Sequence, residues 1–132
     1  MRSRSLGLQK RKEYGGPALQ AFFNIGKAWG LNNGQMKTLL GLENESTYYN
    51  WKKEPTKVIL GNDTLERISY VLGIYKALQI LLPNPEIADK WVNLPNKNPL
   101  FNNQSPIQRM LSGQVADLYL VRRYLDAERG GW

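Results

Sequence analysis

Residues 91–113 read WVNLPNKNPLFNNQSPIQRMLSG, and this stretch is the most informative part of the chain. Its start suits the end of a helix, and its middle is an irregular loop whose asparagine side chains can satisfy unpaired backbone groups. Residues 105–108, SPIQ, then form a capping box with proline in the first turn, which predicts a new helix that ends at Gly113. We expect Trp91 and Phe101 to pin the loop to the neighbouring helices.

The segments on both sides of this loop also carry helix boundaries. Upstream, Asp63 begins a motif like a capping box at the start of a long apolar-faced helix, predicted over residues 64–82. Asn84 and the proline after it predict a further helix that runs to about residue 93. Downstream of Gly113, the last helix is predicted over residues 114–129.

The N-terminal part of the chain predicts three shorter helices. Their expected boundaries are Pro17 to Gly30, a cap at Asn33 with a stop at Gly41, and a cap at Asn44 before residues 45–53. No segment alternates apolar and polar residues as a half-buried strand does. The chain is therefore predicted to be all-α, with about seven helices.

Two short helices joined by a glycine-containing turn and followed by a longer helix are the layout of a helix-turn-helix unit. Residues 45–53 are then the helix that enters the major groove of DNA. Tyr48 and Trp51 lie three residues apart and are expected to face the core. Hydroxyl groups suit phosphates, asparagine can pair with adenine, and lysine can contact guanine or phosphate. The predicted DNA-binding residues are Ser46, Thr47, Tyr49, Asn50 and Lys53. The alternative interpretation is an ordinary solvated helix face.

The charge of the chain is unevenly distributed. The net charge is +7, and residues 1–60 hold ten Lys and Arg against four acids, whereas residues 61–132 hold eight against seven. A positive half beside a neutral half suggests a part that binds a polyanion joined to a part with another task. Residues 1–16 are basic enough for a mobile arm along the DNA backbone, or are simply a polar terminus; their cations are Arg2, Arg4, Lys10, Arg11 and Lys12.

The composition argues against several classes of function. The chain has no histidine and no cysteine, so the commonest general base, the commonest metal ligands and disulfides are all missing. We therefore expect neither an enzyme nor a bound metal or cofactor. The basic N-terminal sequence lacks the apolar run of a signal peptide, and no segment has transmembrane length, so a cytoplasmic protein without membrane association is expected.

The predicted last helix is apolar on two faces. One face carries Leu118 and Leu125, whereas Val121 and Tyr124 lie on the other. Because a helix with two apolar faces must bury both, the second face indicates a homodimer or another protein partner. The chain then ends with two glycines and Trp132, which suits a flexible arm with an apolar anchor, or a tail that folds back onto its own domain.

These features together resemble the Xre/MbcA/ParS-type antitoxins. The strongest matches to the pattern of that family are Trp91, Pro95, Asn96, Phe101, Ser105, Pro106 and Gly113. Residues 66–75 and 39–51 match its long helix and its helix-turn-helix half. The family has glycine where this chain has Asn103, and asparagine tolerates left-handed backbone better than other non-glycine residues.

The resemblance implies an antitoxin of a type II toxin–antitoxin pair. Its three parts would be a basic arm (1–16), an Xre-like helix-turn-helix domain (17–82) and a small helical toxin-binding domain (83–132). The second part would be packed against the third. Such antitoxins bind operator DNA as dimers or larger assemblies and cover the active site of RES-domain toxins, which degrade NAD. By their location, the residues implied to lie at or near the toxin are Tyr119, Arg122, Arg123, Arg129, Gly130, Gly131 and Trp132. A stand-alone helix-turn-helix regulator whose C-terminal half only oligomerises is the alternative.

Overall fold

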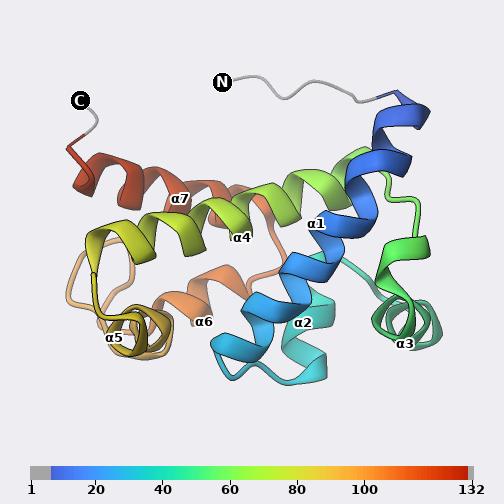
Figure 1. Ribbon diagram of the computed structural model, residues 1–132. Helices are drawn as coiled ribbons and strands as arrows, with labels where there is room; N and C mark the ends of the chain where they lie inside the picture. The colour runs from blue at the N-terminus through green and yellow to red at the C-terminus, as the bar shows by residue number, and fades with distance from the viewer. Residues whose placement is uncertain (1–6, 131–132) are drawn as a thin grey trace.

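The computed structural model describes residues 7–130, and this part of the chain consists of helices joined by turns and loops, without strands (Figure 1). Seven α-helices and two short 3-10 helices are present in it, which confirms the all-α prediction. The elements are α1 (Leu8–Ala28), α2 (Asn33–Leu40), α3 (Glu45–Lys53), η1 (Pro55–Lys57), α4 (Asn62–Leu81), α5 (Pro85–Lys90), η2 (Trp91–Asn93), α6 (Pro106–Met110) and α7 (Val115–Glu128).

The helix α4 is the centre of the fold. It packs against α1 and α2 from the N-terminal half and against α5 and α7 from the C-terminal half. In Figure 1, α7 runs along α4 while α1 crosses it. The inward residues of α4 recur at helical spacing, as a helix buried on one side requires: Ile68, Val71, Ile74, Ala77 and Leu78. One continuous core joins residues of α1, α4 and α7, so the two halves are packed together as predicted.

Several helix ends follow the predicted signals. The Asn44 side chain accepts a hydrogen bond from the Thr47 backbone N–H at 3.0 Å, and that of Asn84 accepts one from Glu86 at 2.9 Å. Gly41 ends α2 in the left-handed conformation at a φ of 74°, which only glycine adopts without strain.

Two predicted caps were wrong. The cap of α2 is Asn32 and not Asn33, because Asn32 and Gln35 exchange side-chain to backbone hydrogen bonds of 2.8 and 2.9 Å. Asp63 does not cap α4, since this helix begins at Asn62 after Gly61. Asp63 instead pairs with Arg67 one turn later, at 3.2 Å.

The first helix begins earlier than predicted. It starts at Leu8 and continues through Pro17, so Lys10, Arg11 and Lys12 lie in α1 rather than in an arm. Proline inside a helix costs about 3 kcal/mol, and contacts elsewhere must offset this cost. They are provided by η1, against which α1 packs so closely that Gly16 is buried on the backbone of Thr56. Arg2 and Arg4 lie outside the described residues.

The loop between η2 and α6 is ordered by hydrogen bonds of its asparagine side chains and by aromatic contacts with the helices. The Asn96 and Asn98 side chains accept hydrogen bonds from the backbone N–H groups of Asn98 and Leu100, both at 2.9 Å. Asn103 has a φ of 64°, which confirms that it takes the left-handed conformation in place of glycine, and Asn102 has a φ of 52°.

An aromatic cluster anchors the same loop to the helices, as predicted. Trp91 and Phe101 meet edge to face at 5.7 Å between ring centroids, and Tyr124 of α7 stacks on Trp91 at 6.4 Å. The second apolar face of the last helix is therefore covered in part by the chain itself. The expectation that a partner must cover this face was wrong for Val121, which is fully buried, whereas Tyr124 is only half-buried by the chain itself.

Candidate nucleic-acid and partner interfaces

The helix-turn-helix unit consists of α2, a short turn and α3, and α3 lies at the end of the molecule away from α5 and the C-terminal end of α7 (Figure 1). Of the residues predicted to bind DNA, Ser46, Tyr49, Asn50 and Lys53 are exposed, whereas Thr47 is half-buried. The outward face of α3 therefore brings four of the five predicted side chains to the surface.

The inward face of α3 is fixed by Tyr48. Its ring is buried and packs edge to face on Phe23 of α1 at 5.9 Å. Its hydroxyl donates a hydrogen bond to Asn33 Oδ1 at 2.8 Å. Burial raises the pKa of Tyr48, and the neighbouring Tyr49 raises it further, so the hydroxyl keeps its proton at neutral pH. Trp51, predicted to share the core with Tyr48, is only half-buried.

Asn33 connects the two helices of the unit, a role that the sequence did not reveal. Its Oδ1 accepts hydrogen bonds from Tyr48 and also from Lys52 Nζ, each at 2.8 Å. These two hydrogen bonds fix the orientation of α3 relative to α2. The only available signal was the pair of adjacent asparagines at 32 and 33, of which either one could cap α2.

The cations around α3 differ in whether an acid neutralises them. Lys37 lies 3.9 Å from Glu45, and Lys57 lies 2.6 Å from Glu54. Within residues 7–130, Lys53 has no ion-pair partner. Its charge is therefore available to an anion.

The residues implied to contact a toxin are separated by the structure into two groups. Tyr119 packs edge to face on Tyr70 of α4 at 5.8 Å, and Arg122 donates to Asp126 at 3.3 Å and to the Ser69 carbonyl at 3.4 Å. The contacts with Tyr70 and the Ser69 carbonyl hold the two side chains against α4. The second group is more open: it comprises the exposed residues Arg123, Arg129 and Gly130.

The end of α7 is held by one carboxylate. Arg129 lies 3.8 Å from Asp126, which also pairs with Arg122. Arg123 has no ion-pair partner within the described part of the chain. Gly130 is in the left-handed conformation at a φ of 73°, which turns the chain away from the helix axis. Gly131 and Trp132 lie outside the described residues.

Arg67 links the helix-turn-helix unit to the start of α7. Its guanidinium lies against Gly41 and donates to the carbonyl of Gly113 at 3.2 Å. The side chain is only 13% exposed and is held by Asp63. In the sequence, Arg67 stood out only as part of a family match, because its contacts join positions 46 residues apart.

The turn between α6 and α7 is held by Asp117. Arg109 Nε donates to this carboxylate at 2.7 Å, and the Ser112 hydroxyl donates to its other oxygen. The Ser112 hydrogen bond, followed by the Arg109 hydrogen bond and charge, lowers the pKa of Asp117 below its usual value, against the effect of burial. Arg109 also donates to the Leu100 carbonyl at 3.1 Å, so the turn and the asparagine-rich loop form one rigid surface.

Two properties of residues 7–130 bear on other functions. No group of three or more acidic side chains is arranged to hold a metal ion there. None of the helices in that range is both long enough and apolar enough to cross a membrane.

Comparison with known proteins assigns both halves of the chain to antitoxin domain families. Residues 11–73 match the antitoxin Xre-like helix-turn-helix domain, and residues 77–131 match the antitoxin Xre/MbcA/ParS C-terminal toxin-binding domain. The chain is also 45% identical over 113 residues to the uncharacterized protein y4oB of Sinorhizobium fredii (strain NBRC 101917 / NGR234), a match that covers 86% of this chain and 84% of that protein. With a helix-turn-helix domain followed by a toxin-binding domain, the chain belongs to the Xre-type antitoxin family.

Proposed function

We propose that the chain neutralises a cognate RES-domain toxin by covering its NAD-degrading active site, and that it binds operator DNA to regulate its own expression. It acts in the cytoplasm as a homodimer or larger assembly and has no catalytic role. One observation carries the proposal: α3 exposes polar residues at one end of the molecule, while the open residues of α7 lie at another (Figure 1). A protein with two separate surfaces can hold DNA and toxin without competition between them.

The DNA-binding half of the proposal rests on α3. Asn50 can pair with adenine and Lys53 can contact guanine or phosphate, and both are exposed. Ser46 lies in the first turn, where hydroxyl and backbone N–H groups suit a phosphate. The buried ring of Tyr48 and its bond to Asn33 keep this face in one orientation, which reduces the entropy lost on binding.

Replacing Lys53 with alanine is expected to weaken binding to the DNA that precedes the coding sequence of this protein. The plot of log affinity against log salt should lose about one unit of slope, because one phosphate contact is removed. Fluorescence anisotropy at several salt concentrations measures both quantities. Lys97→Ala is the matched control, since Lys97 is exposed in the loop of the C-terminal half. Equal slopes for the two variants would reject α3 as the DNA-binding helix.

The toxin-binding half rests on the C-terminal match and on the open end of α7. Arg123 and Arg129 are exposed, and arginines suit an acidic patch or a site built for an anionic substrate such as NAD. We place Tyr119 and Arg122 at the edge of this contact, because both are already held against α4. Trp132 is proposed as an apolar anchor in the cleft of the toxin.

Deleting residues 130–132 is expected to weaken toxin binding by about thirtyfold, the effect of losing one interface anchor worth about 2 kcal/mol. Co-expression with a RES-domain protein from the natural host, with the cellular NAD concentration as readout, tests this. The full chain should restore NAD and the truncated chain should do so only in part.

Two controls complete the experiment. The truncated chain should retain its melting temperature and its DNA affinity, and unfolding would show instead that the tail belongs to the core. If the full chain leaves NAD depleted, the proposed RES-domain partner is wrong. If the deletion leaves neutralisation intact, the tail is not a toxin contact.

A further inference from the structure

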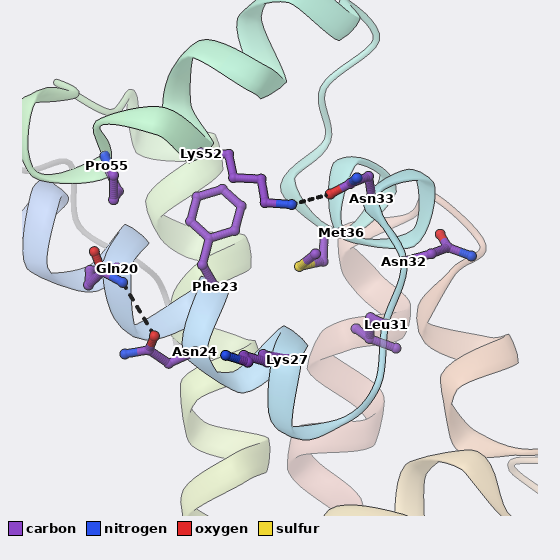
Figure 2. Close-up of a pocket in the computed structure, with 10 residues that line it drawn as sticks. All are labelled: Gln20, Phe23, Asn24, Lys27, Leu31, Asn32, Asn33, Met36, Lys52 and Pro55. Carbon is purple, nitrogen blue, oxygen red and sulfur yellow. Dashed lines mark hydrogen bonds between the residues drawn. The ribbon is translucent and has the colours of Figure 1, made fainter.

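A groove of about 450 Å³ lies between α1, α2 and the end of α3 (Figure 2). Phe23 and Met36 provide apolar walls, and Gln20, Asn24 and Asn33 provide amide groups. None of these residues was predicted to form a binding site. The groove therefore adds a second surface, with both apolar walls and amide groups, beside the exposed face of α3.

The charge of the groove is positive. Its two charged lining residues are Lys27 from α1 and Lys52 from α3, and no carboxylate lines it. Figure 2 shows the two lysines on opposite sides of Phe23. Lys52 donates to the neutral Asn33 amide at 2.8 Å. Within residues 7–130 neither lysine has an ion-pair partner. Two unneutralised cations in one concave surface attract an anion.

The position of the groove relative to α3 indicates which anion it meets. Lys52 and Lys53 are consecutive, so their side chains leave α3 about 100° apart around the helix axis. When the face with Lys53 enters the major groove, the flank with Lys52 turns toward the phosphates that border it. The major groove is about as wide as a helix with its side chains, so these phosphates run close to the flanks of an inserted helix.

We propose that this groove binds the phosphodiester backbone of the DNA strand that borders the major groove. Lys27 and Lys52 neutralise phosphates, and the amide groups of Gln20 and Asn24 donate hydrogen bonds to their oxygens. The Gln20 amide nitrogen now meets Asn24 Oδ1 at 3.3 Å in an exposed pair, which leaves it free to turn toward a ligand. The inference rests on DNA binding by α3, and it adds a contact that positions the protein without selecting sequence.

The test is the double variant Lys27→Gln with Lys52→Gln, titrated with the same upstream DNA used for Lys53→Ala. We expect the salt slope to fall by about two units, because about 0.9 unit is lost for each phosphate no longer neutralised. The ratio of affinities for specific and unrelated DNA should change little. Lys76→Gln is the matched control, because Lys76 is exposed on α4 outside the groove.

A single variant separates charge from structure. Within residues 7–130 the Lys27 side chain forms no ion pair with another element, so Lys27→Gln should lower the slope by about one unit and leave the melting temperature unchanged. A methylphosphonate DNA that lacks the charge of one bordering phosphate should weaken binding by the wild type but not by the double variant.

The outcomes distinguish this inference from the proposed function. If Lys53→Ala lowers the salt slope and the double variant does not, the groove does not bind DNA and only this inference fails. If the wild type shows no salt-dependent binding to its upstream DNA, both fail. If the double variant binds DNA normally but no longer restores NAD in the co-expression assay, the groove holds an acidic segment of the toxin, which also overturns the inference.

Discussion

Replacing Phe101 with alanine is expected to lower the free energy of unfolding by about 3–5 kcal/mol, the usual cost of removing a buried phenyl ring. Phe101 is 3% exposed and meets Trp91 and Tyr124 edge to face. Removing its ring leaves a cavity between the asparagine-rich loop and α7. Domains of this size are stable by about 5–15 kcal/mol, so the loss is a large share of the total.

Urea unfolding followed by tryptophan fluorescence measures this loss, with Leu94→Ala as the control. Leu94 lies in the same region but is 55% exposed, so its replacement should change the free energy of unfolding by less than about 0.5 kcal/mol. Similar effects for the two variants would mean that the loop does not depend on Phe101. A fall in NAD restoration by Phe101→Ala alone would follow from loss of the toxin-binding half.

Gly16→Ala is expected to have the second-largest effect on stability, a loss of about 2–3 kcal/mol from overpacking. A Cβ atom at this position would lie 2.5 Å from the Thr56 carbonyl oxygen and 2.8 Å from its Cα. These are backbone atoms, so η1 must move away from α1. The helix propensity of alanine returns only about 0.5–1 kcal/mol of this loss.

Gly34→Ala is the matched control, because it is also a replacement of glycine by alanine inside a helix. Gly34 is exposed, and the nearest atom to a Cβ there is Asn32 Oδ1 at 3.4 Å. This variant should gain about 0.5–1 kcal/mol from helix propensity. Thermal melting of both variants gives the comparison. A stable Gly16→Ala protein would contradict the close contact between α1 and η1, and with it the physical cause of the early start of α1.

Local signals in the sequence determined the class of fold and most helix ends. Asn44, Asn84 and Gly41 act within four residues of their own position, so the residues that make the cap also reveal it. The same holds for Asn103, whose left-handed backbone depends on its own short side chain. The polar outward face of α3 follows from helical spacing alone.

Only the tertiary structure decided which residues depend on distant contacts. Helix α1 runs through Pro17 because η1, which lies far along the chain, packs on its first turns. Asn32 caps α2, and the Asn33 side chain instead accepts hydrogen bonds from Tyr48 and Lys52 of α3. Arg122 is turned toward α4 because the Ser69 carbonyl and Gly73 lie there.

The same division applies to the candidate binding surfaces. Sequence by itself indicated a DNA-binding helix and a C-terminal partner surface, since each is carried by one continuous segment. The positive groove was not predictable, because Lys27 and Lys52 lie on different helices and line one groove only once Phe23 of α1 packs on Tyr48 of α3. The contacts of Trp91 and Phe101 with Tyr124 on the second apolar face of α7 could not be predicted for the same reason. Spacing along a helix reports which side chains share a face, but packing between helices decides what that face touches.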